Sequence, residues 1–138
     1  MLSYITIGAN DVAASGRFYA AVLTPLGYEK TESPEGIAFT APAVPGRDGG
    51  SATVYVKKPY DGKPAAVGNG SMTAFRAGTH EMVRSVHAAG LRAGGSDEGA
   101  PGFRAEYSAH FYVGYLRDPV GNKLAIFCAD PAQGSRDG

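Results

Sequence analysis

The order of elements predicted for residues 3–59 recurs from residue 71 onward, and this repetition limits the fold more than any single motif. "SYITIG" (3–8) has the pattern of a strand, and Asp11 can cap the helix that follows it. "SMTAFRAG" (71–78) is again strand-like, and Thr79 can cap a second helix. A shift of the sequence by 68 positions places Asp11 on Thr79 (79 − 11 = 68). Each half therefore predicts a strand, a helix and three strands.

The remaining strands follow the two helices, which the pattern extends to about residues 23 and 90. β-rich runs lie at 36–42 and 51–59 in the first half, separated by turn-forming residues 43–50, and at 104–107, 110–117 and 123–128 in the second. A βαβββ unit buries one sheet face under its helix, so two units together can enclose the other face as a pocket. The alternative is an α+β domain with two unrelated amphipathic helices.

Composition excludes several classes of partner. The chain carries 13 basic and 13 acidic residues, with no dense basic block, so we expect neither nucleic acid nor an anionic membrane as partner. No run approaches the length of a spanning helix, and the N-terminus lacks the order of a signal peptide. The single cysteine, Cys128, fits a reducing compartment. We therefore expect a cytoplasmic protein.

The stretch "RDPVGNKLAIFC" (117–128) predicts a hairpin turn that leads into the last strand. If Asp118 pairs with Asn122 across the turn, Tyr115 lies opposite Ala125 and shares a face with it. Val113 and Phe127 follow on that face, whereas Leu116, Leu124 and Ile126 would pack beneath the helices. Cys128 would point away from Phe127 into the core.

Three segments resemble the vicinal oxygen chelate superfamily, which includes glyoxalases, bleomycin-resistance proteins and extradiol dioxygenases. They are "YITIGANDVAASGRFYAAVLTPLGYE", "MTAFRAGTHEMVRSVHAAGLRAGG" and "GAPGFRAEYSAHFYVGYLRDPVGNKLAIF". The resemblance covers residues 2–128 and implies one α+β domain of two βαβββ modules, about 1–59 and 71–128, joined by a linker at 60–70. The modules would form a cupped, partly closed mixed sheet with the helices outside, commonly as a dimer around a divalent metal. Residues 129–138 are predicted to be a frayed tail.

The metal positions that the resemblance implies fall on Tyr4, Met72 and Ala125. None of these residues replaces the histidine and carboxylate ligands that such metals prefer, so we predict no metal and no other cofactor. His80 and His87 lie seven residues apart on one helix, about 10 Å by the usual rise, which is too far to share an ion. We interpret both as solvated helix-face residues. His110 enters a strand near the pocket, where a rim or dimer-contact role is favoured over catalysis.

The predicted pocket is apolar and phenolic rather than metal-binding. Its candidate residues, from strand parity and the resemblance, are Tyr4, Thr6, Met72, Ala74, His110, Val113, Tyr115, Ala125 and Phe127. Alternatively, these side chains fill the old metal site as core.

Three functions remain open at this point. The first is a metal-free binding protein, similar to bleomycin-resistance members, that holds a small apolar or aromatic molecule in a homodimeric cleft. The second is an enzyme of glyoxalase (lyase or isomerase) or dioxygenase type with a rebuilt or metal-independent site, where Tyr4, Tyr115 or His110 would move protons. The third is a structural or regulatory role without a ligand.

Overall fold

The computed structural model describes residues 1–46 and 50–138 and contains two successive βαβββ units. The first consists of β1 (Tyr4–Gly8), α1 (Val12–Leu23), β2 (Glu29–Ser33), β3 (Gly36–Thr40) and β4 (Thr53–Lys57). The second consists of β5 (Thr73–Arg76), α2 (His80–Arg92), β6 (Ser96–Phe103), β7 (Tyr112–Arg117) and β8 (Lys123–Cys128). Short 3-10 helices follow α1 (η1, Thr24–Leu26) and β8 (η2, Pro131–Gln133). The predicted α+β fold of two βαβββ modules is confirmed.

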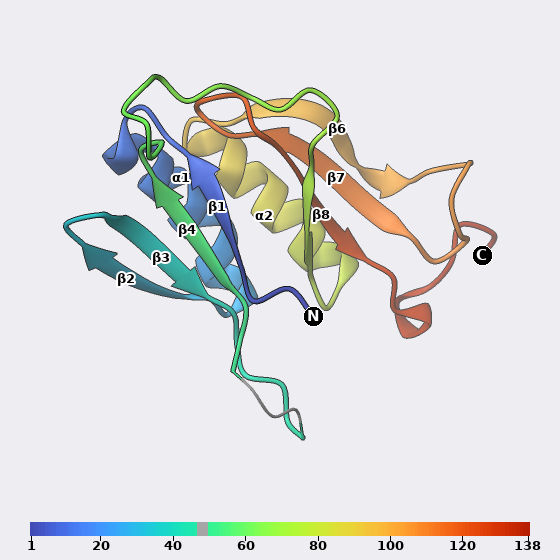
Figure 1. The fold of residues 1–138 in the computed structure, drawn as a ribbon. Coiled ribbons are helices and arrows are strands. Elements are labelled where there is room, and N and C mark those ends of the chain that lie inside the picture. Colours follow the sequence, from blue (N-terminus) through green and yellow to red (C-terminus); the bar gives the residue numbers. More distant parts are fainter. Residues whose placement is uncertain (47–49) are drawn as a thin grey trace.

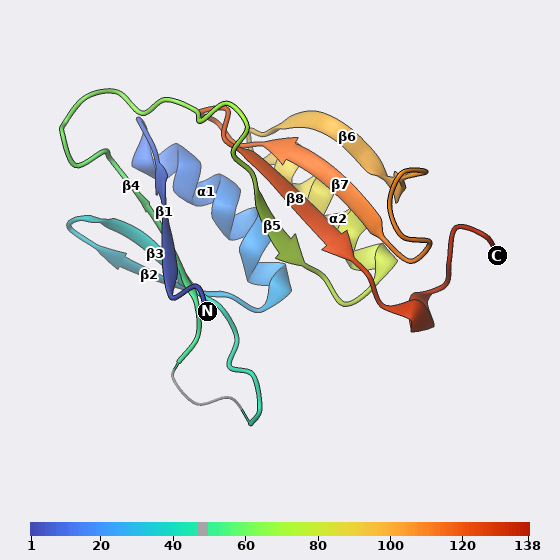
Figure 2. The ribbon, with the colours of Figure 1, turned by 45° about the vertical axis from the view of Figure 1, so that its right-hand side comes forward.

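Each module forms its own four-stranded mixed sheet, in the orders β1-β4-β3-β2 and β5-β8-β7-β6. The first strand of each module runs parallel to its last strand, and the other neighbours are antiparallel. Both helices lie behind the strands in the view of Figure 1, and Figure 2 shows β1 and β5 as the facing edge strands of the two sheets, with α1 visible between them. Within the described ranges no ladder joins β1 to β5, so the two sheets stay open instead of closing partly into one.

Both helices begin at the predicted caps. The Asp11 side chain accepts a hydrogen bond from the Ala14 N–H, and the Thr79 hydroxyl accepts one from the Met82 N–H. The helices then bury their apolar stripes against the sheets, and α1 also packs against α2. In the part of the chain that the structure describes, no helix has the length and hydropathy needed to cross a membrane.

One face of each sheet lies under its helix and forms the core. Alternation within each strand sends every second side chain to this face. The core is built from aliphatic and aromatic residues of both modules: Phe18, Tyr19, Val22, Leu23, Phe39, Val54, Val56, Val83, Val86, Leu116, Leu124 and Ile126. Cys128 is a buried free thiol, as predicted. The opposite face of each sheet carries no helix, and the candidate site is built there (Figure 1).

Two strands differ from the sequence-based expectations. The strand β2 was not predicted from the sequence, because its residues, "EKTES", are all exposed and show no apolar alternation. The strand predicted at 104–107 is wrong, since these residues form a turn and the strand β6 precedes them at Ser96–Phe103. β6 contains Gly99, Pro101 and Gly102, and its pairing with β7 shifts register twice, so its pattern is broken by irregularities. Of the turn predicted at 43–50, residues 47–49 lie outside the described residues.

The interpretation of two histidines as solvated is also wrong. The His87 side chain is only 6% exposed, and its Nε2 lies 3.1 Å from the Tyr115 carbonyl oxygen and 3.2 Å from Asp97 Oδ1. The His80 ring stacks on Tyr112 with centroids 4.2 Å apart, and its Nε2 is buried. The two rings therefore belong to the packing between α2 and the second sheet.

The C-terminal segment 129–138 is attached to the domain, in contrast to the predicted frayed tail. The Arg136 guanidinium donates hydrogen bonds to three backbone carbonyls in the turn after β6, those of Arg104, Ala105 and Tyr107. The Arg136 backbone N–H donates to the Ala109 carbonyl over 2.7 Å. One side chain thus fastens the last residues to the turn between β6 and β7.

A buried polar cluster connects the two modules at the β7–β8 hairpin. The Tyr19 hydroxyl of α1 donates to Asp118 Oδ2 over 2.7 Å, and Asn122 Nδ2 donates to the same oxygen over 2.9 Å. The other oxygen, Asp118 Oδ1, accepts the three backbone N–H groups of residues 120–122. Asn122 Nδ2 also lies 3.3 Å from the Gly8 carbonyl oxygen of β1. The hairpin turn is therefore tied to both α1 and β1.

The linker between the modules arcs over one end of both sheets (Figures 1 and 2). Residues 60–70 contain no helix or strand and are mostly exposed, as predicted. The Ala65 N–H donates to Asn10 Oδ1 over 2.7 Å, which fixes the middle of the linker beside the start of α1.

Candidate functional site

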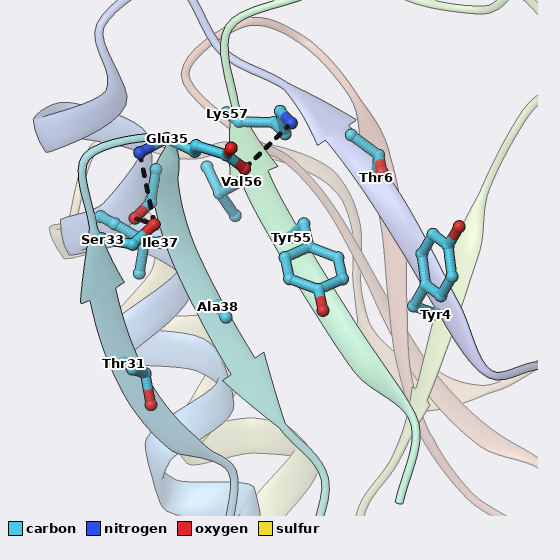
Figure 3. Close-up of a pocket in the computed structure, with 11 residues that line it drawn as sticks. Tyr4, Thr6, Thr31, Ser33, Glu35, Ile37, Ala38, Tyr55, Val56 and Lys57 are labelled. Carbon is cyan, nitrogen blue, oxygen red and sulfur yellow. Dashed lines mark hydrogen bonds and ion pairs between the residues drawn. The ribbon is translucent and has the colours of Figure 1, made fainter.

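A hollow of about 650 Å³ lies on the open face of the first sheet (Figure 3). Strand alternation places its lining there: in "TVYVK" of β4, Val54 and Val56 enter the core, while Tyr55 and Lys57 face outward. All four strands contribute, and the lining residues are Tyr4, Thr6, Thr31, Ser33, Glu35, Gly36, Ile37, Ala38, Tyr55, Val56 and Lys57. Of these, Ile37 and Val56 are core residues that the hollow also touches.

Two tyrosines form one side of this hollow. The Tyr4 and Tyr55 rings meet edge to face, with centroids 5.6 Å apart and planes 81° apart. Their side chains remain accessible, with 63% and 39% of the residue surface exposed. Beside Tyr55 the small Ala38 leaves room above β3, and the Thr31 hydroxyl on β2 lies across that space (Figure 3). The hollow therefore offers aromatic surface and hydroxyl groups together.

An ion pair lies at one end of the hollow. Lys57 Nζ is 3.9 Å from Glu35 Oε2, and both side chains are at least one-third exposed. The Ser33 hydroxyl accepts a hydrogen bond from the Glu35 backbone N–H over 3.3 Å. The Lys57 charge is thus already opposed by a carboxylate.

The open face of the second sheet is covered by its own side chains. Tyr115 pairs with Ala125 and Leu116 with Leu124, which confirms the cross-strand register expected from the turn. Ala125 is only 1% exposed. The Lys123 ammonium lies 5.1 Å and the Arg104 guanidinium 5.5 Å from the centre of the Tyr115 ring. Burial raises the pKa of the Tyr115 phenol above its ordinary value, and Tyr107 raises it further.

Phe127 is covered in the same way. The Arg76 guanidinium lies 4.9 Å from the centre of its ring, and Phe111 stacks on it with centroids 5.5 Å apart. Val113, between Tyr115 and Phe111 along the chain, is fully buried. Cations and aromatic rings therefore occupy this face.

A second hollow, about 230 Å³, lies between the modules, where β1 approaches β5 and the β7–β8 hairpin. We call it the inter-module cleft. Its lining residues are Thr6, Ile7, Gly8, Tyr19, Ala66, Gly68, Ser71, Met72, Thr73, Asn122 and Lys123. Thr6 lines both the cleft and the hollow on the first sheet, so the two spaces adjoin at β1.

The residues selected from sequence do not form one cluster. Tyr4 and Thr6 line the hollow, and Met72 lines the cleft with Thr6. Ala74 pairs with Ala125 on the second sheet, beside Val113, Tyr115 and Phe127. His110 lies beside the C-terminal segment, with its Nδ1 3.4 Å from the Gly134 carbonyl oxygen.

Most of the residues that line the hollow were not identified from the sequence. Thr31 and Ser33 lie on the strand that carried no apolar signal. Tyr55 and Lys57 alternate with two valines, and this alternation on β4 would have assigned them to the same face as Tyr4.

The three positions that the family pattern assigns to a metal do not suit one. Tyr4 and Met72 are exposed, while Ala125 has no donor atom and is almost inaccessible. A neutral phenol and a thioether are poor ligands for divalent zinc, nickel, manganese or iron. In residues 1–46 and 50–138, no group of three or more His, Cys, Asp or Glu side chains is arranged to hold a metal.

Comparison with known proteins identifies related structures. No family model and no curated protein matches the sequence. A glyoxalase/bleomycin resistance protein from Albidiferax ferrireducens T118 is 34% identical, with a TM-score of 0.78 over 94% of this chain and 99% of that one. Two further structures share the fold. A glyoxalase-related enzyme from Fulvimarina pelagi is 20% identical, with a TM-score of 0.65 over 95% of this chain and 88% of that one. A lactoylglutathione lyase from Agrobacterium tumefaciens is 18% identical, with a TM-score of 0.58 over 93% of this chain and 92% of that one. The chain therefore belongs to the glyoxalase/bleomycin resistance protein family, within the vicinal oxygen chelate superfamily.

Proposed function

We propose that this protein binds a small aromatic molecule without a metal, in the hollow on its first sheet. The observation that carries the proposal is the lining of that hollow: two accessible tyrosine rings beside hydroxyl groups and a small floor residue, Ala38. A concave site with aromatic surface and a few polar groups is the usual form of a small-molecule site. The family's metal positions hold two poor ligands, Tyr4 and Met72, and an alanine without a donor atom, Ala125. This set of residues supports a metal-independent function.

The two tyrosines favour a planar ligand. Aromatic rings attract each other edge to face or offset, and each favourable pair contributes about 0.5–1.5 kcal/mol beyond the buried area. A ring placed over Ala38 would meet the Tyr55 ring on one side and reach the Thr31 hydroxyl on the other (Figure 3). An aromatic ligand with a hydrogen-bonding substituent therefore matches the hollow.

The enzyme alternative has weaker chemical support. Proton transfer by a phenol near neutral pH needs a pKa lowered from about 10. The pKa of Tyr115 is shifted the other way, because burial disfavours its phenolate. His110 lies against the C-terminal segment rather than beside the hollow. Stoichiometric binding needs no such group.

The proposal includes a homodimer in the cytoplasm. Two sheet faces without a covering helix are available for a second copy, and the buried free thiol of Cys128 suits a reducing compartment. Light scattering coupled to gel filtration tests the dimer, and a monomer at micromolar concentration would contradict it.

A fluorescence titration tests binding. N-phenyl-1-naphthylamine, an uncharged aromatic probe, should bind saturably and equally well with and without EDTA. Tyr55→Ser removes one aromatic contact and should weaken binding about threefold to tenfold. Tyr60→Ser is the matched control, because Tyr60 is fully exposed and outside the lining. No saturable binding, or binding abolished by EDTA, would contradict the proposal.

A further inference from the structure

In the part of the chain that the structure describes, the charge on Lys123 is not neutralised by an ion pair, in contrast to those on Lys57 and Lys30. Lys57 lies 3.9 Å from Glu35, and Lys30 lies 3.4 Å from Glu32. Within the described ranges, Lys123 has no carboxylate within 4 Å, and its recorded interaction is with the Tyr115 ring. Lys123 nevertheless lines the inter-module cleft.

The cleft has no negative charge of its own to balance this cation. Lys123 is the only charged residue among its described lining residues. Besides Tyr19, whose hydroxyl donates to Asp118, three hydroxyl-bearing residues of the cleft lining, Thr6, Ser71 and Thr73, supply possible hydrogen-bond donors. Arg104 shares the Tyr115 ring with Lys123, so a second positive charge lies near the same ring. Hydroxyl donors beside an uncompensated cation form a suitable environment for an anion.

The buried carboxylate of Asp118 does not form an ion pair with Lys123. Both oxygens of Asp118 are engaged by five donors from Tyr19, Asn122 and the backbone of the hairpin turn. Its hydrogen bonds hold the turn and leave the ammonium of Lys123 without an ion-pair partner in the described structure.

The position of the cleft relates this charge to the hollow. Because Thr6 lines both spaces, a molecule over the first sheet can extend past β1 toward Lys123. We propose that the ligand is an aromatic compound with one anionic group, its rings at β1 where the hollow adjoins the cleft and its anion in the cleft against Lys123. This inference rests on the proposed function and adds the charge of the ligand and the residue that recognises it.

Two fluorescent probes that differ in one anionic group test the inference. 1-Anilinonaphthalene-8-sulfonate carries a sulfonate, and N-phenyl-1-naphthylamine is its uncharged counterpart. Lys123→Gln should weaken binding of the sulfonate about fivefold and change binding of the neutral probe by less than about 1.5-fold. Lys123→Arg should restore most of the sulfonate affinity. Lys63→Gln is the matched control, because Lys63 lines neither space.

The other possible results distinguish failure of this inference from failure of the proposed function. Equal effects of Lys123→Gln on both probes would overturn the inference while leaving the proposed function intact. Loss of sulfonate binding in Lys57→Gln instead of Lys123→Gln would also overturn it, because the anion would then lie at the end of the hollow. Failure of both probes to bind the wild-type protein would overturn the proposed function together with the inference. Circular dichroism of each variant checks that the fold is retained.

Discussion

Replacement of Tyr19 by phenylalanine isolates the energy of the contact that joins the modules. The Tyr19 ring is buried and stays in place, and only the hydroxyl that donates to Asp118 Oδ2 over 2.7 Å is lost. Hydrogen bonds to charged groups contribute about 1.5–3 kcal/mol. We therefore expect Tyr19→Phe to lower the free energy of unfolding by about 2 kcal/mol at pH 7.

The same contact predicts how this difference depends on pH. Burial raises the pKa of the Tyr19 hydroxyl above its ordinary value, and the charge and hydrogen bond of Asp118 raise it further. The hydroxyl therefore ionises above about pH 10 in the unfolded chain but not in the folded one. The unfolded state then binds fewer protons, so the stability of the wild-type protein falls by about 1.4 kcal/mol per pH unit from this group. Tyr19→Phe lacks the effect, and the 2 kcal/mol gap should close near about pH 11.5.

Urea unfolding of both proteins between pH 7 and 11.5 provides the measurement. The raised pKa values of Tyr28 and Tyr115 act in both proteins and cancel in the difference. Tyr60→Phe, which removes the hydroxyl of a fully exposed side chain, should leave the free energy of unfolding unchanged at pH 7. A loss below about 0.5 kcal/mol at pH 7, or a gap that stays constant above pH 10, would refute the reasoning.

Three further results follow from the structure. Arg136→Ala removes three hydrogen bonds to backbone carbonyls, so limited proteolysis should cut within 129–138 much faster, whereas unchanged cleavage would contradict the attachment. Gly90→Ala places a methyl group 2.7 Å from Leu116 Cδ1 and should lower stability by about 1–3 kcal/mol in thermal unfolding, although alanine is the better helix former. Added zinc or nickel should leave the melting temperature of the wild-type protein unchanged, and a concentration-dependent increase would show that the protein binds the metal.

Local signals in the sequence were sufficient for the helices and for the last hairpin. The caps at Asp11 and Thr79 act on residues three positions away, and the register of Tyr115 with Ala125 follows from a short turn. The burial of His87 depends instead on contacts with Tyr115 and Asp97, which lie on other elements. Such contacts exist only after α2 has packed against the second sheet.

The site was less predictable than the fold for a related reason. β2 is an edge strand with no buried side, so nothing in "EKTES" distinguishes it from a loop. Without β2, the hollow on the first sheet lacks the wall formed by Thr31 and Ser33. The prediction therefore placed the pocket mainly on the second sheet, where strand parity was strongest but side chains cover the face.

Because the two sheets are separate, the hollow and the inter-module cleft are held in shape by different parts of the fold. The hollow lies on four strands joined by backbone hydrogen bonds, so its shape is as rigid as the sheet itself. The cleft instead lies between two separate sheets, whose modules also meet through their helices, where Gly90 allows α2 to approach Val22 and Phe18 of α1. We therefore expect a side chain at position 90, distant in sequence from the lining residues, to change the width of the cleft without altering the hollow on the first sheet.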